Sequence, residues 1–194
     1  MNYPEYVKAG NKQYKINTDF RVAIECNQIA QDETIGDFER LLAVIYKLFG
    51  NEALIDTENY ETLMKLAKKY LKCGKEGEES SGIQEEQDMD YIQDMDYIEA
   101  SFMSDYHIDL SNTKMHWWKF SKLMDGLSNS ELGNCCILNR IRNLRNFDES
   151  KIEDNKERQK IRKAKEQVAL NKKEIILTEE QERSMEELNR ILGL

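Results

Sequence analysis

The sequence predicts a mainly α-helical fold, a helical domain of about seven or eight helices with a small N-terminal β-hairpin. Only one proline and nine glycines occur in 194 residues, so helix breakers are few. Apolar residues recur at spacings of three and four along most of the chain, the period of an amphipathic helix. Hydrophobic residues make up 40% and charged residues 34%, which favours a modest core with long solvated helix faces.

The hairpin is predicted near the N-terminus. Residues 6–16 read YVKAGNKQYKI, and the Gly10–Asn11 pair suits a tight turn with positive φ between two short strands. Two strands alone are marginally stable, so we expect the hairpin to pack on other elements.

Three helices complete an N-terminal region, residues 1–73. The first runs from about Phe20 to Ala30, capped by Thr18 or Asp19. The second starts near Thr34 with an approximate capping box and ends at Gly50. The third spans roughly residues 58–73. Their apolar stripes are Val22, Cys26 and Ile29; Phe38, Leu41, Leu42, Ile45, Leu48 and Phe49; and Tyr60, Leu63, Ala67 and Tyr70.

Residues 74–87, rich in Gly, Ser and Glu, predict a flexible acidic linker. A helical core region, residues 88–146, follows and opens with a tandem hexapeptide, DMDYIQ then DMDYIE. Six is not a multiple of 3.6, so equivalent residues of the two copies fall on different helix faces.

Three helices are predicted in the core region. The second starts within residues 111–114 and ends near Gly126, and the third begins at a capping box of Ser128 and Glu131 and runs to about Leu144. The inward stripes of the first two helices are Tyr91, Met95, Ile98 and Phe102, and Trp117, Phe120, Met124 and Leu127.

The C-terminal region, residues 147–194, is expected to form charged helices. A weakly docked helix has the sparse stripe Ile161, Ala164 and Val168. Thr178 caps a last helix, in which the residues that face inward are Met185, Leu188 and Leu192.

Charge and hydropathy restrict the class of function. The net charge of −9 argues against general nucleic-acid binding, which needs an electropositive surface. No run approaches about 18 apolar residues, so we expect no membrane span. The N-terminal stretch MNYPEYVKAGNKQYK has no apolar core segment and is not expected to be a signal peptide. The four cysteines are then expected to be reduced, intracellular thiols.

Two groups of residues contain side chains that could bind a metal. His107 and His116 with Cys135 and Cys136 lack a CxxC pair, and adjacent cysteines on one helix diverge by about 100°. The carboxylates within residues 85–99 do not follow the order of an EF-hand loop. Solvated or core positions explain both groups better, and we expect no metal and no cofactor.

A nucleophilic cysteine is the enzymatic alternative. Cys26, Cys73 or Cys135 would need a neighbouring base or an electropositive setting, and none stands in a recognisable motif. We therefore expect no catalytic residues and no enzyme.

Two features leave alternatives open. Trp117 and Trp118 diverge on one helix, so either both are mostly buried or Trp118 is a partly exposed anchor for a partner. A basic cluster is a solvated helix face, a nucleic-acid contact, or a partner for the acidic region 76–99 in the same molecule or a neighbouring copy. The cluster consists of Lys156, Arg158, Lys160, Arg162, Lys163 and Lys165.

Five segments occur in a distinctive order: INTDFR at 16–21, DMDYIEASF at 94–102, DYHIDL at 105–110, MHWWKF at 115–120 and GL at 126–127. With the Lys/Arg-rich run to Leu170, they resemble the bacteriophage gene-product-fifteen family of tailed phages and prophages of Gram-positive bacteria. The resemblance covers about residues 12–170. The doubled hexapeptide and the tail after about residue 172 depart from the family pattern.

The resemblance implies a phage protein with no catalytic residues to carry over. Genes of this family tend to lie between those of the major tail protein and the tape-measure protein, a position typical of tail assembly chaperones. We therefore expect a non-enzymatic tail assembly chaperone in the host bacterial cytoplasm. Its expected partners are the tape-measure protein and/or the major tail protein, with a homo-oligomer as a further expectation, and neither membrane nor nucleic acid.

Adaptable methionine and aromatic side chains suit such a chaperone. The methionines between residues 88 and 127 are Met89, Met95, Met103, Met115 and Met124, and those outside the inward stripes are expected to be exposed. The candidate partner-binding residues are Trp118, Met103, Met115 and Tyr106. The alternative function is a nucleic-acid-binding phage regulator that uses the basic helix at residues 151–170.

Overall fold

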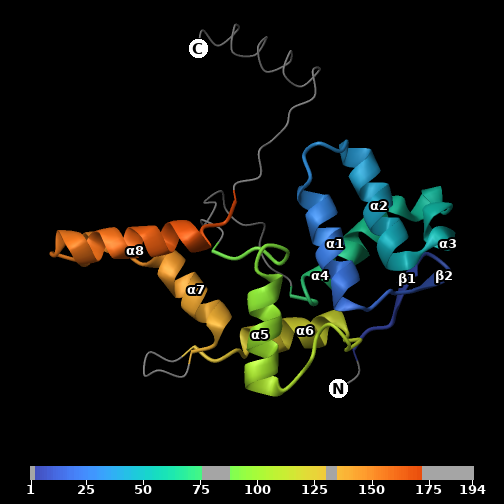
Figure 1. Ribbon diagram of the computed structural model, residues 1–194. Coiled ribbons are helices and arrows are strands. Elements are labelled where there is room, and N and C mark those ends of the chain that lie inside the picture. Colours follow the sequence, from blue (N-terminus) through green and yellow to red (C-terminus); the bar gives the residue numbers. More distant parts are fainter. Residues whose placement is uncertain (1–2, 76–87, 130–134, 172–194) are drawn as a thin grey trace, which may run out of the picture. The chain divides into compact units, whose positions relative to one another are not determined.

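A computed structural model describes residues 3–75, 88–129 and 135–171 (Figure 1). These residues form eight α-helices and one two-stranded antiparallel sheet, which confirms the mainly α fold with an N-terminal hairpin. They divide into two compact units. The N-terminal unit comprises residues 4–17 and 22–71, and the C-terminal unit comprises residues 3, 18–21 and 72–171.

The hairpin consists of β1, Tyr6–Ala9, and β2, Lys12–Lys15, paired in antiparallel register. Gly10 has a φ of 58°, so the predicted turn with positive φ is confirmed. β1 packs against α4 (Tyr60–Leu71). Tyr14 of β2 is buried, and its hydroxyl donates a hydrogen bond to Asp56. The hairpin therefore has the packing partner that two strands need.

The first helix, α1 (Phe20–Gln31), begins where it was predicted. Asp19 accepts a hydrogen bond from the backbone N–H of Arg21 at 3.0 Å, the contact expected of a capping residue. On the predicted stripe Cys26 is buried, whereas Val22 and Ile29 are half-buried.

The second helix, α2 (Asp37–Phe49), begins three residues later than predicted. Asp32 binds both the backbone N–H and the hydroxyl of Thr34, at 3.0 and 2.5 Å, and this local turn competes with a helix start at Thr34. The prediction that Phe38 is buried is wrong. It lies in the first turn of α2 and is 61% exposed, and the buried stripe is Val44, Ile45, Leu48 and Phe49.

Gly50 ends α2 as predicted, with a φ of 78° and its N–H bound to the carbonyl of Tyr46 at 2.9 Å. Two short elements that were not predicted follow, α3 (Asn51–Leu54) and a 3₁₀ turn at Thr57–Asn59. The next helix, α4, buries Leu63, Ala67 and Tyr70 of the predicted stripe.

The C-terminal unit holds α5 (Met95–Tyr106), α6 (Trp117–Asp125), α7 (Ile137–Asn146), a 3₁₀ turn (Glu149–Lys151) and α8 (Asn155–Val168) (Figure 1). Its core is aromatic. The ring of Phe120 stacks on those of Phe20, Phe102 and Trp117, at centroid distances of 4.4, 5.2 and 5.8 Å. The predicted inward positions of α5 and α6 therefore share one core.

The two hexapeptide copies adopt different structures, whereas the predicted helix stripe began within the first copy, at Tyr91. Residues of the first copy enter a turn before α5, and those of the second form the start of α5. Ile92 of the first copy is 50% exposed, whereas Ile98 of the second is completely buried.

The predicted start of α6 within residues 111–114 is wrong. Asp109 binds the backbone N–H and hydroxyl of Ser111, at 3.0 and 2.5 Å, and holds a turn there. The helix begins at Trp117, where His116 Nδ1 accepts the N–H of Trp118 at 3.0 Å. Gly126 ends it as predicted.

The predicted start of α7 at Ser128 is also wrong. The Ser128 carbonyl accepts the N–H of Cys136 at 3.0 Å, and Asn129 pairs with Cys135 in an isolated antiparallel bridge. The helix begins at Ile137, with Cys136 as its N-cap. Glu131, the other half of the predicted capping box, lies outside the described residues.

The predicted weak docking of α8 is confirmed, because none of its residues is buried. The predicted helix beyond Thr178, with Met185, Leu188 and Leu192, lies outside the described residues. So does the predicted linker from residue 76 to residue 87.

Candidate functional site

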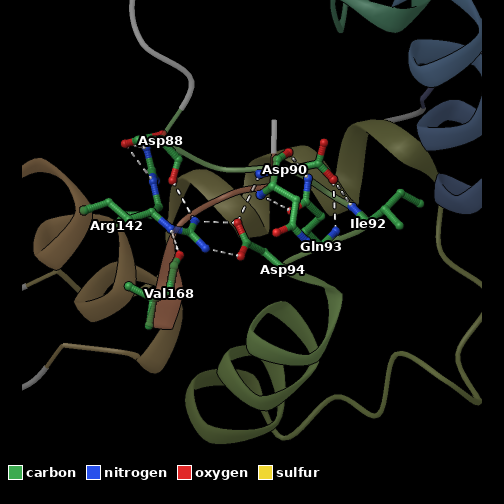
Figure 2. A network of polar contacts seen from close by, with 9 residues as sticks. Asp88, Asp90, Ile92, Gln93, Asp94, Arg142 and Val168 are labelled. Carbon is green, nitrogen blue, oxygen red and sulfur yellow. Dashed lines mark hydrogen bonds and ion pairs between the residues drawn. The ribbon is translucent and has the colours of Figure 1, made fainter. Parts of the chain in front are cut away.

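A polar network connects the turn before α5 with α7 and with the end of α8 (Figure 2). At its centre Asp94 and Arg145 form a two-point ion pair. Nη1 of Arg145 lies 2.7 Å from Oδ2 of Asp94, and Nη2 lies 2.6 Å from Oδ1. The side chains are 1% and 10% exposed, and the Asp94 carboxylate raises the pKa of Arg145. Burial at this level requires that both charges be fully paired.

Two further donors of Arg145 bind backbone carbonyls. Nε donates to Val168 at 2.6 Å and Nη1 donates to Asp88 at 2.9 Å. Asp94 Oδ2 also accepts the backbone N–H of Asp90 at 3.0 Å. One guanidinium therefore fixes three segments that are distant in the sequence.

A second layer of contacts surrounds this pair. Asp88 accepts hydrogen bonds from Nε of Arg142 at 3.1 Å and from the amide of Asn146 at 3.2 Å (Figure 2). Gln93 and the backbone of Asn171 exchange two hydrogen bonds, at 2.7 and 3.2 Å. All of these contacts are made within the chain, so the network acts as a structural clamp between the turn before α5, α7 and the end of α8.

The network bears on the predicted pairing between the acidic region 76–99 and the basic cluster of α8. Within the described residues its paired carboxylates, Asp88 and Asp94, bind arginines of α7 and not the basic residues of α8. Sequence reasoning missed this clamp. The available signal was Asp94 itself, a charged residue four positions before Ile98 on the apolar face of α5.

A separate hollow of about 750 Å³ lies on the C-terminal unit beside α5. Its walls are Ala100, Ser104, Asp105, Tyr106, Gly126, Ser128, Cys135, Cys136, Ile137 and Arg140. Burial alone would raise the pKa of Asp105, but hydrogen bonds from the backbone and side chain of Ser128 lower it, so this wall carries a carboxylate. The mixture of apolar and polar walls is typical of a surface that binds another molecule.

The four candidate partner-binding residues lie in four different environments. Tyr106 lines the hollow, and its hydroxyl donates to the carbonyl of Leu123 at 2.9 Å. Met103 is 47% exposed, three positions along α5 from Ala100 in the hollow's wall. Trp118 is half-buried and lies against Gly74. Met115 is 5% exposed, and its carbonyl accepts the N–H of Phe20, so it is a core residue in this structure.

Met89, Met95 and Met124 are half-buried, so Met103 is the one exposed methionine among the five of this region. The hollow itself was not predicted, because its walls come from α5, the end of α6 and the start of α7.

The thiols weighed as nucleophiles lie in surroundings that keep them protonated. Burial raises the pKa of Cys26 to about 12. Burial also raises the pKa of Cys73 and of Cys135. A thiol with a raised pKa is a poor nucleophile at neutral pH.

The histidines weighed as metal ligands have other positions. His107 closes α5 in a left-handed conformation with a φ of 55°, and His116 caps α6. Across residues 3–75, 88–129 and 135–171, no three His, Cys, Asp or Glu side chains gather as a metal site would require. In the same residues no helix combines the length and the apolar content of a membrane span.

Comparison with known proteins places this architecture in a family. No curated protein and no solved structure matches the chain. A family model described as Bacteriophage Gp15 protein matches residues 3–170, a stretch that begins before the hairpin and ends just after α8. The match includes the network, the hollow and the MHWWKF segment. The chain therefore belongs to the Bacteriophage Gp15 protein family.

Proposed function

We propose that this phage protein is a non-enzymatic assembly factor, a tail assembly chaperone that binds the tape-measure protein or the major tail protein. Family membership carries the proposal. The resemblance implies that genes of this family tend to lie between those of these two proteins. The raised pKa values of Cys26, Cys73 and Cys135 support a role without covalent catalysis.

The hollow on the C-terminal unit provides a surface for such a partner. Ala100, Tyr106 and Ile137 contribute apolar wall, and Met103 extends it along α5. A flexible thioether adapts to varied apolar partners, and a hollow of about 750 Å³ accommodates several side chains of an amphipathic helix. The proposal therefore assigns partner contact to Met103 and Tyr106.

Co-expression tests the proposal directly. The full chain, tagged, is expressed with a tape-measure fragment or with the major tail protein, and soluble partner recovered on the tag is measured. We expect the chain to keep the tape-measure fragment soluble and to co-purify with it. Failure with both partners would refute the chaperone function.

Surface variants then test the site. Met103→Glu and Ala100→Arg place charge on the exposed face and in the hollow, and each is expected to lower partner recovery about tenfold. Ile55→Glu is the matched control, because Ile55 is 73% exposed on the N-terminal unit. If Ile55→Glu lowers recovery as strongly, the hollow is not the partner site.

A further inference from the structure

The basic residues of α8 fall into two sets with different surroundings. Arg158 donates to the carbonyl of Ile152, Arg162 pairs with Glu149 at 3.0 Å, and Lys165 donates to the carbonyl of Phe147 at 2.8 Å. These three side chains hold α8 to the preceding segment. The other three basic residues, Lys156, Lys160 and Lys163, form no ion pair with the part of the chain that the structure describes.

The second set forms one stripe along α8. Lys156, Lys160 and Lys163 are spaced i, i+4 and i+7, so they fall within about 60° of the helix circumference and extend over about 10 Å. All three are exposed, whereas Ile161, Ala164 and Val168 on the adjacent face are half-buried. We call these three residues the lysine stripe.

A stripe of opposite charge runs along the outer face of α5. Asp96, Glu99 and Met103 are spaced i, i+3 and i+7, so they share a face that differs from the one of the buried residues Ile98 and Phe102. Asp96 is exposed, Glu99 is half-exposed, and neither carboxylate has an ion-pair partner among the described residues. We call these three residues the acidic stripe.

We propose that the lysine stripe of one copy of this chain binds the acidic stripe of a second copy. The two stripes are opposite in charge, and the charged pairs Lys160–Lys163 and Asp96–Glu99 have the same i, i+3 spacing. None of these charges has a partner among the described residues. The buried network is not available for this role, because Asp88 and Asp94 already bind Arg142 and Arg145. Self-association of this kind does not depend on the proposed chaperone function.

The expected contact is weak and sensitive to salt. An exposed ion pair contributes at most about 1 kcal/mol, and added salt screens it. Met103 lies at the end of the acidic stripe and is 47% exposed, so the aliphatic stems of the opposing lysines can cover it while their ammonium groups reach the carboxylates.

Charge also favours a second copy over nucleic acid. The chain carries a net charge of −9, which repels a polyanion. Half of the basic cluster is already bound within the chain, and Glu157 and Glu166 interrupt the remainder of α8. Three lysines therefore face a partner, few compared with the contacts that give strong phosphate binding.

A charge-swap experiment tests the proposal. The full chain and two variants, K160E/K163E and D96K/E99K, are studied by sedimentation velocity at about 50 mM salt, where screening is weak. We expect the unmodified chain to associate with increasing concentration and each variant alone to remain monomeric. An equimolar mixture of the two variants is expected to associate again, because each reversed stripe meets its complement on the other variant.

Controls separate charge complementarity from loss of structure. K8E/K68E changes the net charge as much as K160E/K163E does, but on exposed lysines of the N-terminal unit, and is expected to associate like the unmodified chain. The combined variant D96K/E99K/K160E/K163E restores complementary stripes in one chain and should self-associate. Raising the salt to about 500 mM should weaken association of the unmodified chain at least about tenfold.

Several outcomes would overturn the proposal. They are a chain that stays monomeric at low salt, variants that still self-associate, a mixture that does not associate, or a K8E/K68E control that is equally impaired. A monomeric chain that binds duplex DNA through the lysine stripe would assign that stripe to nucleic acid instead. Because tape-measure recovery is measured separately, failure of self-association is distinguishable from failure of the chaperone function.

Discussion

The hydroxyl of Ser101 accepts the backbone N–H of Leu138 at 3.1 Å, so a side chain in the middle of α5 caps the start of α7. Both residues are completely buried. The N–H of Leu138 belongs to the first turn of α7, where backbone donors have no acceptor inside their own helix. The same hydroxyl donates to the carbonyl of Tyr97 at 2.7 Å, which fixes its orientation.

Replacing Ser101 is therefore expected to destabilise the C-terminal unit. Ser101→Ala leaves a buried donor without an acceptor and should lower the free energy of unfolding by about 1–3 kcal/mol. Urea unfolding followed by circular dichroism measures the change. Ser104→Ala on the exposed side of α5 is the control and should change stability by less than about 0.5 kcal/mol. Equal losses in the two variants would contradict the capping role.

Breaking the Asp94–Arg145 pair should lower the free energy of unfolding by more than Ser101→Ala does. Asp94→Asn leaves a buried guanidinium without its counter-charge, and removal of one partner from a buried pair typically costs about 3–5 kcal/mol. Thermal and urea unfolding report the loss. Asp96→Asn changes a neighbouring exposed carboxylate and should leave stability nearly unchanged. A small effect of Asp94→Asn would show that the network is not the clamp described above.

The Tyr14–Asp56 hydrogen bond predicts a change of stability at both ends of the pH range. Burial and the hydrogen bond to Asp56 raise the pKa of Tyr14 to about 12. The unfolded tyrosine loses its proton near pH 10, so its contribution is complete below pH 10 and is lost as the pH rises toward about 12.

The contribution of Asp56 to stability depends on pH in the opposite direction. Hydrogen bonds from Tyr14 and Asn59 lower the pKa of Asp56, so its contribution is lost as the pH falls through that lowered value. Tyr14→Phe should reduce both slopes in a plot of unfolding free energy against pH. Tyr91 and Tyr106 also have raised pKa values, so the difference between the two proteins is the quantity to measure. Parallel curves would contradict the coupling.

The contact between Gly74 and Trp118 predicts a larger cost than backbone strain alone. Gly74 has a φ of 74°, and a Cβ there would lie 2.9 Å from Cη2 of Trp118. Gly50 has a similar φ of 78°, with no atom within 4 Å of its Cβ position. Gly50→Ala should thus lose about 1–3 kcal/mol to backbone strain alone, because its ψ of −172° lies in a region nearly restricted to glycine. Gly74→Ala should lose at least about 1 kcal/mol to the close approach of Trp118, in addition to its own backbone strain.

Tryptophan fluorescence during urea unfolding distinguishes these two variants. Trp118→Leu should reduce the additional cost of Gly74→Ala, because the smaller side chain removes the close approach. If Trp118→Leu leaves the cost of Gly74→Ala unchanged, Trp118 does not restrict the residue at position 74.

The elements that were predicted correctly depend on nearest neighbours along the chain. Gly10–Asn11 fixed the hairpin turn, and the apolar spacing around Ile98 and Phe120 located two core helices. The helix starts were less accurate. Asp32 and Asp109 bind backbone groups two residues ahead, and these local turns delay the helices that Thr34 and Ser111 were expected to begin.

The long-range parts of the site could not be read from periodicity. Asp94 and Arg145 are 51 residues apart, and neither residue alone indicates its partner. The hollow beside Tyr106 depends on how α5, α6 and α7 pack together. Spacing along one helix contains no information on which helix covers it, so Met115 was expected at a partner surface although it packs in the core.

Either copy of the doubled hexapeptide could occupy the start of α5, and the residues that follow the repeat decide which copy does. A slip by one copy would put Asp88 in the place of Asp94 and Ile92 in the place of Ile98, and both substitutions conserve the residue type. The same slip would put Asp96 at the completely buried position of Phe102. The unique register of α5 is therefore enforced by the residues after the repeat, and a change in the length of the preceding acidic segment need not disturb the aromatic core.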